Sequence, residues 1–177
     1  MTSGSGDHEM GLIEIPFDDD MWAECKRISL ARSAPKRRWK KNFEDGNHSD
    51  DIHFMGVVGE AAACVFFGCE LNREINGGDK HEPDIVTGGI GIEVKASKYS
   101  PPHLKFTSME RFGRRSHIAV VVHVDLYRRV GTLWGYVDRR EFAERHEVAS
   151  YGHGSCLVMK PPYRDMLALK GIYLDNS

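Results

Sequence analysis

One aspartate, two glutamates and one lysine lie in two short segments where their types and spacing could support metal-dependent chemistry. In the run IGIEVKA, residues 90–96, Glu93 and Lys95 alternate with apolar side chains as in a half-buried strand. A Gly-Gly pair precedes this run and favours a two-residue hairpin turn. We therefore predict a hairpin in which residues 84–87 pair with residues 90–96.

The turn determines which residues of this hairpin oppose each other. With two glycines at the tip, Ile85 pairs with Ile92 and Asp84 falls opposite Glu93, where Cβ atoms are about 4.5–5.5 Å apart. Two carboxylates at this distance repel each other, and a divalent cation between them reverses the sign of the interaction. Lys95 shares the face of Glu93, roughly 7 Å further along the strand. The alternative is a charged strand face that is simply exposed to solvent.

A third carboxylate lies in an apolar segment. Residues 55–68 read MGVVGEAAACVFFG, in which Glu60 is the only charge, so the predicted helix is buried on nearly every side. A buried carboxylate without a partner costs several kcal/mol or is forced to protonate. A metal ion shared with Asp84 and Glu93 would satisfy Glu60. A salt bridge to an arginine or a lysine, such as Lys95, is the alternative.

Three carboxylates and a lysine at one place would support hydrolysis of a phosphodiester. Magnesium prefers oxygen ligands and completes its shell with water and a substrate phosphate. Its bound water becomes a better nucleophile, and the ion offsets charge in the transition state. Lys95 could orient or deprotonate the attacking water, or stabilise the developing charge.

The remaining elements must bring these residues together. Pro35 is expected to end a first helix and Gly68 to end a second, and IAVVVHV predicts a strand buried on both faces. We predict helices at 21–34, 52–67, near 108–115 and at 138–146, a polar loop at 43–51, and strands at 69–75, 84–87, 90–96, 118–124 and 131–137. This order predicts an α/β domain with a mixed central β-sheet flanked by helices, spanning residues 16–177 after a disordered tail at 1–15.

The distribution of charge favours a nucleic-acid partner more than its sum does. The formal net charge is −2, yet the run KRISLARSAPKRRWKK, residues 26–41, holds basic residues and no acid. This basic region, with the helix from residue 21, is either a solvated surface or a phosphate-binding patch. The residues expected to bind phosphate are Lys36, Arg37, Arg38, Lys40 and Lys41.

Composition argues against a membrane protein and against a thiolate metal site. No apolar run approaches the roughly 18 residues of a membrane span, and the N-terminus lacks the features of a signal peptide, so we expect a cytoplasmic protein without a membrane partner. The 4 cysteines have no zinc-type spacing.

Taken together, these residues resemble the PD-(D/E)xK nuclease superfamily. Its signature is a Pro-Asp followed, on the next strand, by an acid, any residue and a lysine, which matches Pro83-Asp84 and Glu93-Val94-Lys95. Many members also carry a glutamate on the preceding helix, and Gly59-Glu60-Ala61 looks like that element. The similar region runs from about residue 55 to residue 137.

The resemblance implies a restriction-endonuclease-like core and a DNA substrate. It implies Mg²⁺ or Mn²⁺ bound by Asp84 and Glu93, with Glu60 as an additional ligand or metal orienter, and Lys95 as the catalytic lysine. Lys98 and Ser97 follow closely and are candidates for contacting the phosphate, and Asp79 is a possible substitute for Asp84. Double-strand cutters of this kind often act as dimers, so a homodimer is compatible with the resemblance. The superfamily includes restriction, repair, phage and mobile-element nucleases, and no motif selects among them.

Two other functions stay open at this point. A nucleic-acid-binding module could keep the nuclease fold without cleavage, although the intact set of acids and lysine weighs against it. An α/β protein unrelated to nucleic acid could instead use Glu60 and Lys95 as a buried ion pair. Metal binding and cleavage separate these three readings.

Overall fold

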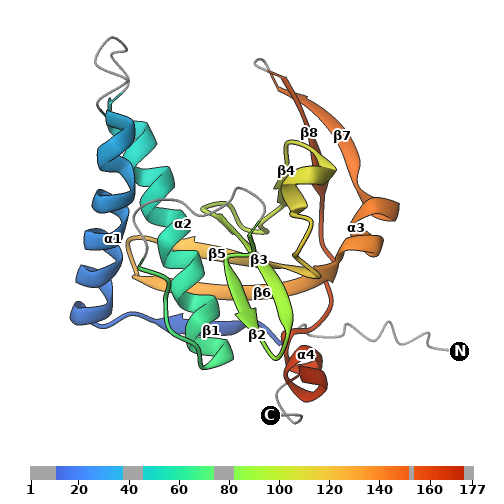
Figure 1. Cartoon of the computed structure of the whole chain (residues 1–177), viewed down its shortest axis with the longest axis horizontal. Coiled ribbons are helices and arrows are strands. Elements are labelled where there is room, and N and C mark those ends of the chain that lie inside the picture. The colour runs from blue at the N-terminus through green and yellow to red at the C-terminus, as the bar shows by residue number, and fades with distance from the viewer. Residues whose placement is uncertain (1–10, 38–45, 74–81, 152–153, 174–177) are drawn as a thin grey trace, which may run out of the picture.

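The chain folds helices and strands around one central sheet (Figure 1). The computed structural model describes residues 11–37, 46–73, 82–151 and 154–173. The elements, in chain order, are β1 (Ile13–Pro16), α1 (Asp19–Arg37), α2 (Gly46–Phe67), β2 (Ile85–Thr87), β3 (Ile90–Ser97), β4 (Leu104–Phe106), the 3₁₀ helix η1 (Met109–Phe112), β5 (Ile118–Asp125), β6 (Val130–Asp138), α3 (Arg139–Arg145), β7 (Glu147–Tyr151), β8 (Gly154–Met159) and α4 (Met166–Tyr173).

The central sheet is mixed and has five strands in the order β1-β6-β5-β3-β2. β3 and β5 run parallel, and the other neighbours run antiparallel. Strands β4, β8 and β7 form a second, antiparallel sheet. In Figure 1 the pair α1 and α2 stands on one side of β3 and the strands β7 and β8 stand on the other. The predicted α/β class and the mixed sheet flanked by helices are therefore confirmed.

β5 separates two apolar cores, as its continuous apolar sequence predicts. Val120 and Val122 belong to the core that contains the buried side chains of α1 and α2. Ala119 and Val121 belong to a second core, which β4, η1, α3 and β8 build against the opposite face. All four side chains are fully buried, so β5 lies in the middle of the fold and supports β3 beside it.

α2 lies unusually close to β3 at Gly59. A Cβ atom at this position would lie 2.7 Å from the Cβ of Ala96, well inside the 3.5–4.0 Å at which carbon atoms pack best. Only a glycine therefore permits this approach. Glu60, the next residue of α2, is carried to the edge of β3 by the same contact.

The helices differ from the prediction at three places. α1 continues past Pro35 to Arg37, so the helix ends within one turn after the proline, which lacks one helical N–H and crowds the preceding turn, and not before it. α2 begins at Gly46 rather than at residue 52, so the predicted loop at 43–51 is wrong from residue 46 onward; a helix anchored by a buried turn can extend through polar sequence. η1 occupies part of the predicted helix near 108–115. Among the described residues, no helix is long and apolar enough to span a membrane.

The strands differ mainly where the sequence carries weak patterns. Residues 69–73 form no strand, so that part of the predicted strand at 69–75 is wrong. β1 covers Ile13–Pro16 and pairs with β6, so the predicted disordered tail extends too far at residues 13–15. β4, β7, β8 and α4 were not predicted, because each is short or depends on pairing with a distant segment.

Candidate functional site

The β2–β3 hairpin has the register that its turn predicts. Thr87 pairs with Ile90, Val86 with Gly91 and Ile85 with Ile92. Both turn glycines have positive φ, 54° at Gly88 and 76° at Gly89, as the favoured hairpin turn requires. Because β2 begins only at Ile85, the edge of β3 beyond Ile92 is left without a partner strand.

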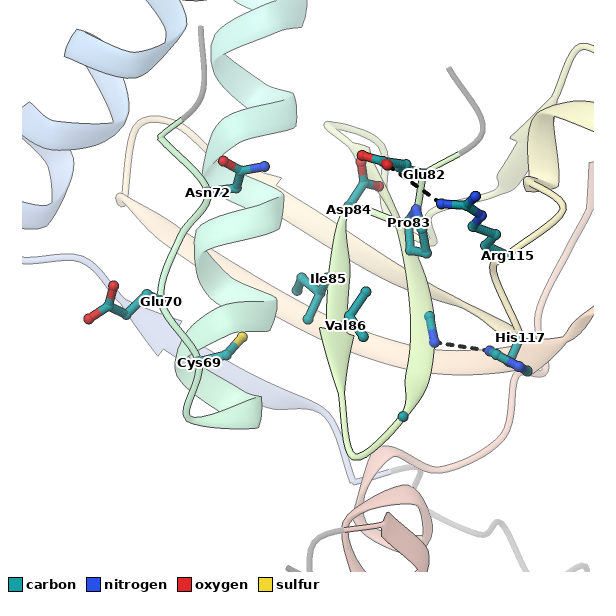
Figure 2. Close-up of a pocket in the computed structure, with 12 residues that line it drawn as sticks. Cys69, Glu70, Asn72, Glu82, Pro83, Asp84, Ile85, Val86, Arg115 and His117 are labelled. Atoms are coloured by element: carbon teal, nitrogen blue, oxygen red, sulfur yellow. Dashed lines mark hydrogen bonds and ion pairs between the residues drawn. The ribbon is translucent and has the colours of Figure 1, made fainter. Parts of the chain in front are cut away.

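Asp84 closes this open edge. Its carboxylate oxygen Oδ2 accepts a hydrogen bond of 2.7 Å from the backbone N–H of Val94. Figure 2 shows Asp84 at the end of β2, beside Pro83 and Glu82, where it borders a pocket of about 630 Å³. The hydrogen bond thus holds the Asp84 carboxylate next to the segment of β3 that carries Glu93 and Lys95.

Glu93 and Lys95 share one face of β3, as alternation along a strand predicts. They pair in register with Ala119 and Val121 of β5, so they face the core formed with β4 and not the face covered by α2. Glu93 is only 9% exposed. The Lys95 ammonium group pairs with Glu93 Oε1, and it lies 5.0 Å from the ring centroid of Phe106.

Glu60 reaches the same region from α2, and its partner is Arg32. Arg32 Nη1 donates to Glu60 Oε2 at 2.8 Å, and Arg32 Nη2 donates to the carbonyl oxygen of Asn72 at 2.8 Å. The alternative reading of Glu60, an ion pair to a basic residue, is thus present, but the partner is Arg32 and not Lys95. Both side chains are mostly buried, at 24% and 17% exposure for Arg32 and Glu60.

Arg32 was not among the predicted site residues, although its position in the sequence carries a signal. Cys25 and Ile28 are buried on the inner face of α1, and Arg32 continues their spacing at helical periodicity. A charged residue that continues an apolar stripe needs a buried partner. That partner is Glu60, which is the only charge in the apolar part of α2.

The three carboxyl groups form one electrostatic cluster, here called the acidic cluster (Glu60, Asp84 and Glu93). Burial raises the pKa of all three carboxyl groups, and the charge of Asp84 raises the pKa of both glutamates further. The charge of Glu60 also raises the pKa of Glu93. In the opposite direction, Arg32 lowers the pKa of Glu60, Lys95 lowers that of Glu93, and the Val94 hydrogen bond lowers that of Asp84. The cluster therefore concentrates negative charge that the protein compensates only in part.

The structure describes only some of the other predicted site residues. Lys98 is exposed, just after the end of β3. Lys36 and Arg37 belong to the last turn of α1, whereas Arg38, Lys40, Lys41 and Asp79 lie outside the described residues. Within the described ranges, no group of three His, Cys, Asp or Glu side chains is placed to hold a metal ion. Glu60 pairs with Arg32, and Glu93 pairs with Lys95.

The arrangement as a whole can bind a cation or a phosphate group, or both. Carboxylates of the acidic cluster offer hard oxygen ligands, and the Lys95 ammonium lies beside them. A comparison of the chain with protein-family models, with curated proteins and with solved structures finds no match. The chemistry of the site must therefore be inferred from its own residues.

Proposed function

We propose that the chain is a metal-dependent nuclease that hydrolyses phosphodiester bonds of DNA. The observation that carries the proposal is the acidic cluster itself: Asp84, fixed by the Val94 N–H, lies near two further carboxyl groups whose pKa its charge raises, and Lys95 pairs with one of them. Such a group is costly to keep in a fold that does not use it. The residues and their order also resemble the PD-(D/E)xK superfamily, so we propose a restriction-endonuclease-like core.

A magnesium or manganese ion fits the donors of the acidic cluster. All three are carboxylates, which suit a hard cation, and the cluster holds uncompensated negative charge that such an ion would neutralise. Asp84 and Glu93 would hold the ion, with Glu60 as an additional ligand or orienting group. When bound, the ion makes water more nucleophilic and offsets negative charge on the phosphate.

The protein's own residues have distinct tasks in this proposal. The Asp84 carboxylate is held in place by the Val94 N–H, so one ligand is oriented before any ion binds. Lys95 Nζ, paired with Glu93 Oε1, can orient the attacking water, accept its proton or stabilise charge on the phosphate oxygens. Arg32 holds Glu60 at the cluster. DNA contacts through the basic run at residues 36–41 stay a prediction.

One observation favours a second candidate, a nucleic-acid-binding module without cleavage. In the structure Arg32 and Lys95 each pair with a carboxylate of the acidic cluster, and Asp84 has no ion pair with any of the residues that the structure describes. A site balanced in this way could persist without a metal ion. A cleavage assay separates the two candidates, because both bind DNA and only the first cuts it.

The test is a cleavage assay on supercoiled and linear DNA with Mg²⁺, Mn²⁺ or EDTA. The wild-type chain should cut in either metal and not in EDTA, and Lys95→Ala should lower the rate by at least 100-fold. Lys160→Ala is the matched control, because this exposed lysine pairs with Glu147 in the second sheet, away from the cluster. Equal rates for wild-type and Lys95→Ala would show that the assigned site is wrong, and binding without any cutting would favour the silent module.

A further inference from the structure

A second pocket opens at the end of β3, and none of the three carboxylates of the acidic cluster lines it. It has a volume of about 470 Å³, and its lining residues come mainly from α2, the end of β3 and β4. Lys95 itself lines it. The part of a ligand that occupies this pocket therefore lies next to the part that contacts Lys95.

The lining of this pocket combines positive charge with exposed apolar surface. Lys95, Lys98 and Lys105 contribute ammonium groups, and Asp51 is the one acidic residue among the lining residues. Ile52 and Tyr99 also line it, although they are 55% and 65% exposed. The pocket therefore offers exposed apolar surface and cationic groups to the same ligand.

Tyr99 is placed to present an aromatic face together with a cation. The Nζ atom of Lys98 lies 5.5 Å from the centroid of its ring, within the range of a cation–π contact. Aromatic rings beside a positively charged groove are the usual means by which proteins bind unpaired bases, since every base offers a face for stacking.

A nucleotide that is paired in a duplex does not suit this lining. Its base faces are covered by the neighbouring base pairs, and it presents only groove edges and phosphates. An unpaired nucleotide offers a base face to Tyr99 and Ile52 and a phosphate to the lysines. The volume of the pocket lies within the range of pockets that hold small ligands, which suits a single nucleotide.

We infer that this pocket receives one unpaired nucleotide of a nucleic-acid strand, next to the phosphate held at Lys95. The inference rests on the proposed function for the choice of DNA, and it narrows the substrate to single-stranded DNA or to an unpaired end or flap. The base packs on Tyr99 and Ile52, and Lys98 and Lys105 contact its phosphates.

The test measures binding in EDTA, so that cleavage plays no part. Fluorescence anisotropy would compare a labelled single-stranded octanucleotide with a blunt duplex of the same sequence. The single strand should bind more tightly, and Tyr99→Ala should weaken it about 5- to 100-fold, the range expected for loss of one stacked base, with little change for the duplex. Ile52→Ser should act in the same direction.

The control is Tyr127→Ala, which removes a tyrosine that is 97% exposed and does not line the pocket; it should leave both affinities unchanged. Equal affinity for strand and duplex, or unchanged strand affinity in Tyr99→Ala, overturns the inference. So does thymidine 5′-monophosphate competing as strongly as the octanucleotide, because the ligand would then be a free nucleotide. A separate cleavage assay with Mg²⁺ distinguishes failure of this inference from failure of the proposed function. Binding of the single strand without cutting contradicts only the proposed function. Cutting with a preference for duplex contradicts only this inference.

Discussion

Replacing Asp84 by asparagine should stabilise the metal-free protein, which is the opposite of what a structural carboxylate would show. Asparagine has nearly the same shape, and its Oδ1 can still accept the hydrogen bond from the N–H of Val94. The substitution therefore removes the charge and keeps the contact. The result depends on whether that charge is favourable where it lies.

The magnitude follows from two opposing effects. Asp84 is half-buried, and moving a carboxylate out of water costs up to several kcal/mol, of which we take about 2 kcal/mol for this exposure. The hydrogen bond from Val94 weakens by about 1 kcal/mol when its acceptor loses its charge. Repulsion between Asp84 and the two glutamates opposes its attraction to Arg32 and Lys95, and we take these two effects as equal. The net gain is about 1 kcal/mol, or roughly 2–4 °C in melting temperature for a chain of this size.

The pH dependence of stability also tests whether Asp84→Asn stabilises the protein. Burial raises the pKa of Asp84 in the folded state, so protonation favours folding, and the stability linked to this group is lost as pH rises through the raised pKa. The advantage of Asp84→Asn should therefore be largest at neutral pH. It should disappear below the ordinary aspartate pKa of about 3.9, because the wild-type group is then neutral too.

Thermal unfolding in EDTA, followed by circular dichroism from about pH 3 to about pH 8, measures this effect on both sides of the ordinary aspartate pKa. Asp165→Asn is the control, because that exposed aspartate also accepts a backbone N–H, from Leu167, and should change stability by less than about 0.5 kcal/mol. A lower melting temperature for Asp84→Asn at neutral pH would refute the reasoning. Asp84 would then be an ordinary cap on the edge of β3.

Three further predictions concern the same region. Mg²⁺ at about 100 times its Kd should stabilise the wild type by about 2.7 kcal/mol in thermal unfolding and leave Asp84→Asn much less affected; an equal shift in both would place the ion elsewhere. Arg32→Met should destabilise the protein by about 3–5 kcal/mol in a urea titration because Glu60 loses its partner. Adding Glu60→Gln should recover most of this loss; no recovery would mean that Arg32 stabilises the fold through its hydrogen bond to the Asn72 carbonyl. Gly59→Ala should lower the free energy of unfolding by about 1–3 kcal/mol through its contact with Ala96. Gly56→Ala meets no atom within 4 Å and should raise the free energy of unfolding by up to about 1 kcal/mol. Similar values at both sites would contradict the close approach of α2.

Local chemistry made the hairpin and the main strands predictable. The Gly-Gly turn permits few geometries, so the pairing of Ile85 with Ile92 followed from it. β5 was recognisable because a strand buried on both faces is apolar throughout. The helix predicted at 138–146 is α3. Asp138 caps it, because its side chain accepts a hydrogen bond of 2.7 Å from the N–H of Glu141.

Elements that depend on distant partners were not predictable in the same way. β1 is only four residues long, and it is a strand because β6 offers it an edge. β8 pairs with both β7 and β4, but the sequences of β7 and β8 carry no strong alternation of apolar and polar residues. Propensity is a weak guide for such segments, because pairing and burial decide their structure.

The sequence by itself determined the residues of the candidate site. It showed which acids lie on the hairpin, that Lys95 shares a strand face with Glu93, and that Glu60 needs a partner. These follow from the two-residue period of a strand and from the cost of a buried charge, which are local properties. Only the tertiary structure decided that Arg32 of α1 is that partner, that Lys95 pairs with Glu93, and that a pocket with Tyr99 lies beside Lys95. Such choices depend on how α1, α2, β3 and β4 pack together, and no short-range pattern records the distances between segments that meet only in the folded chain.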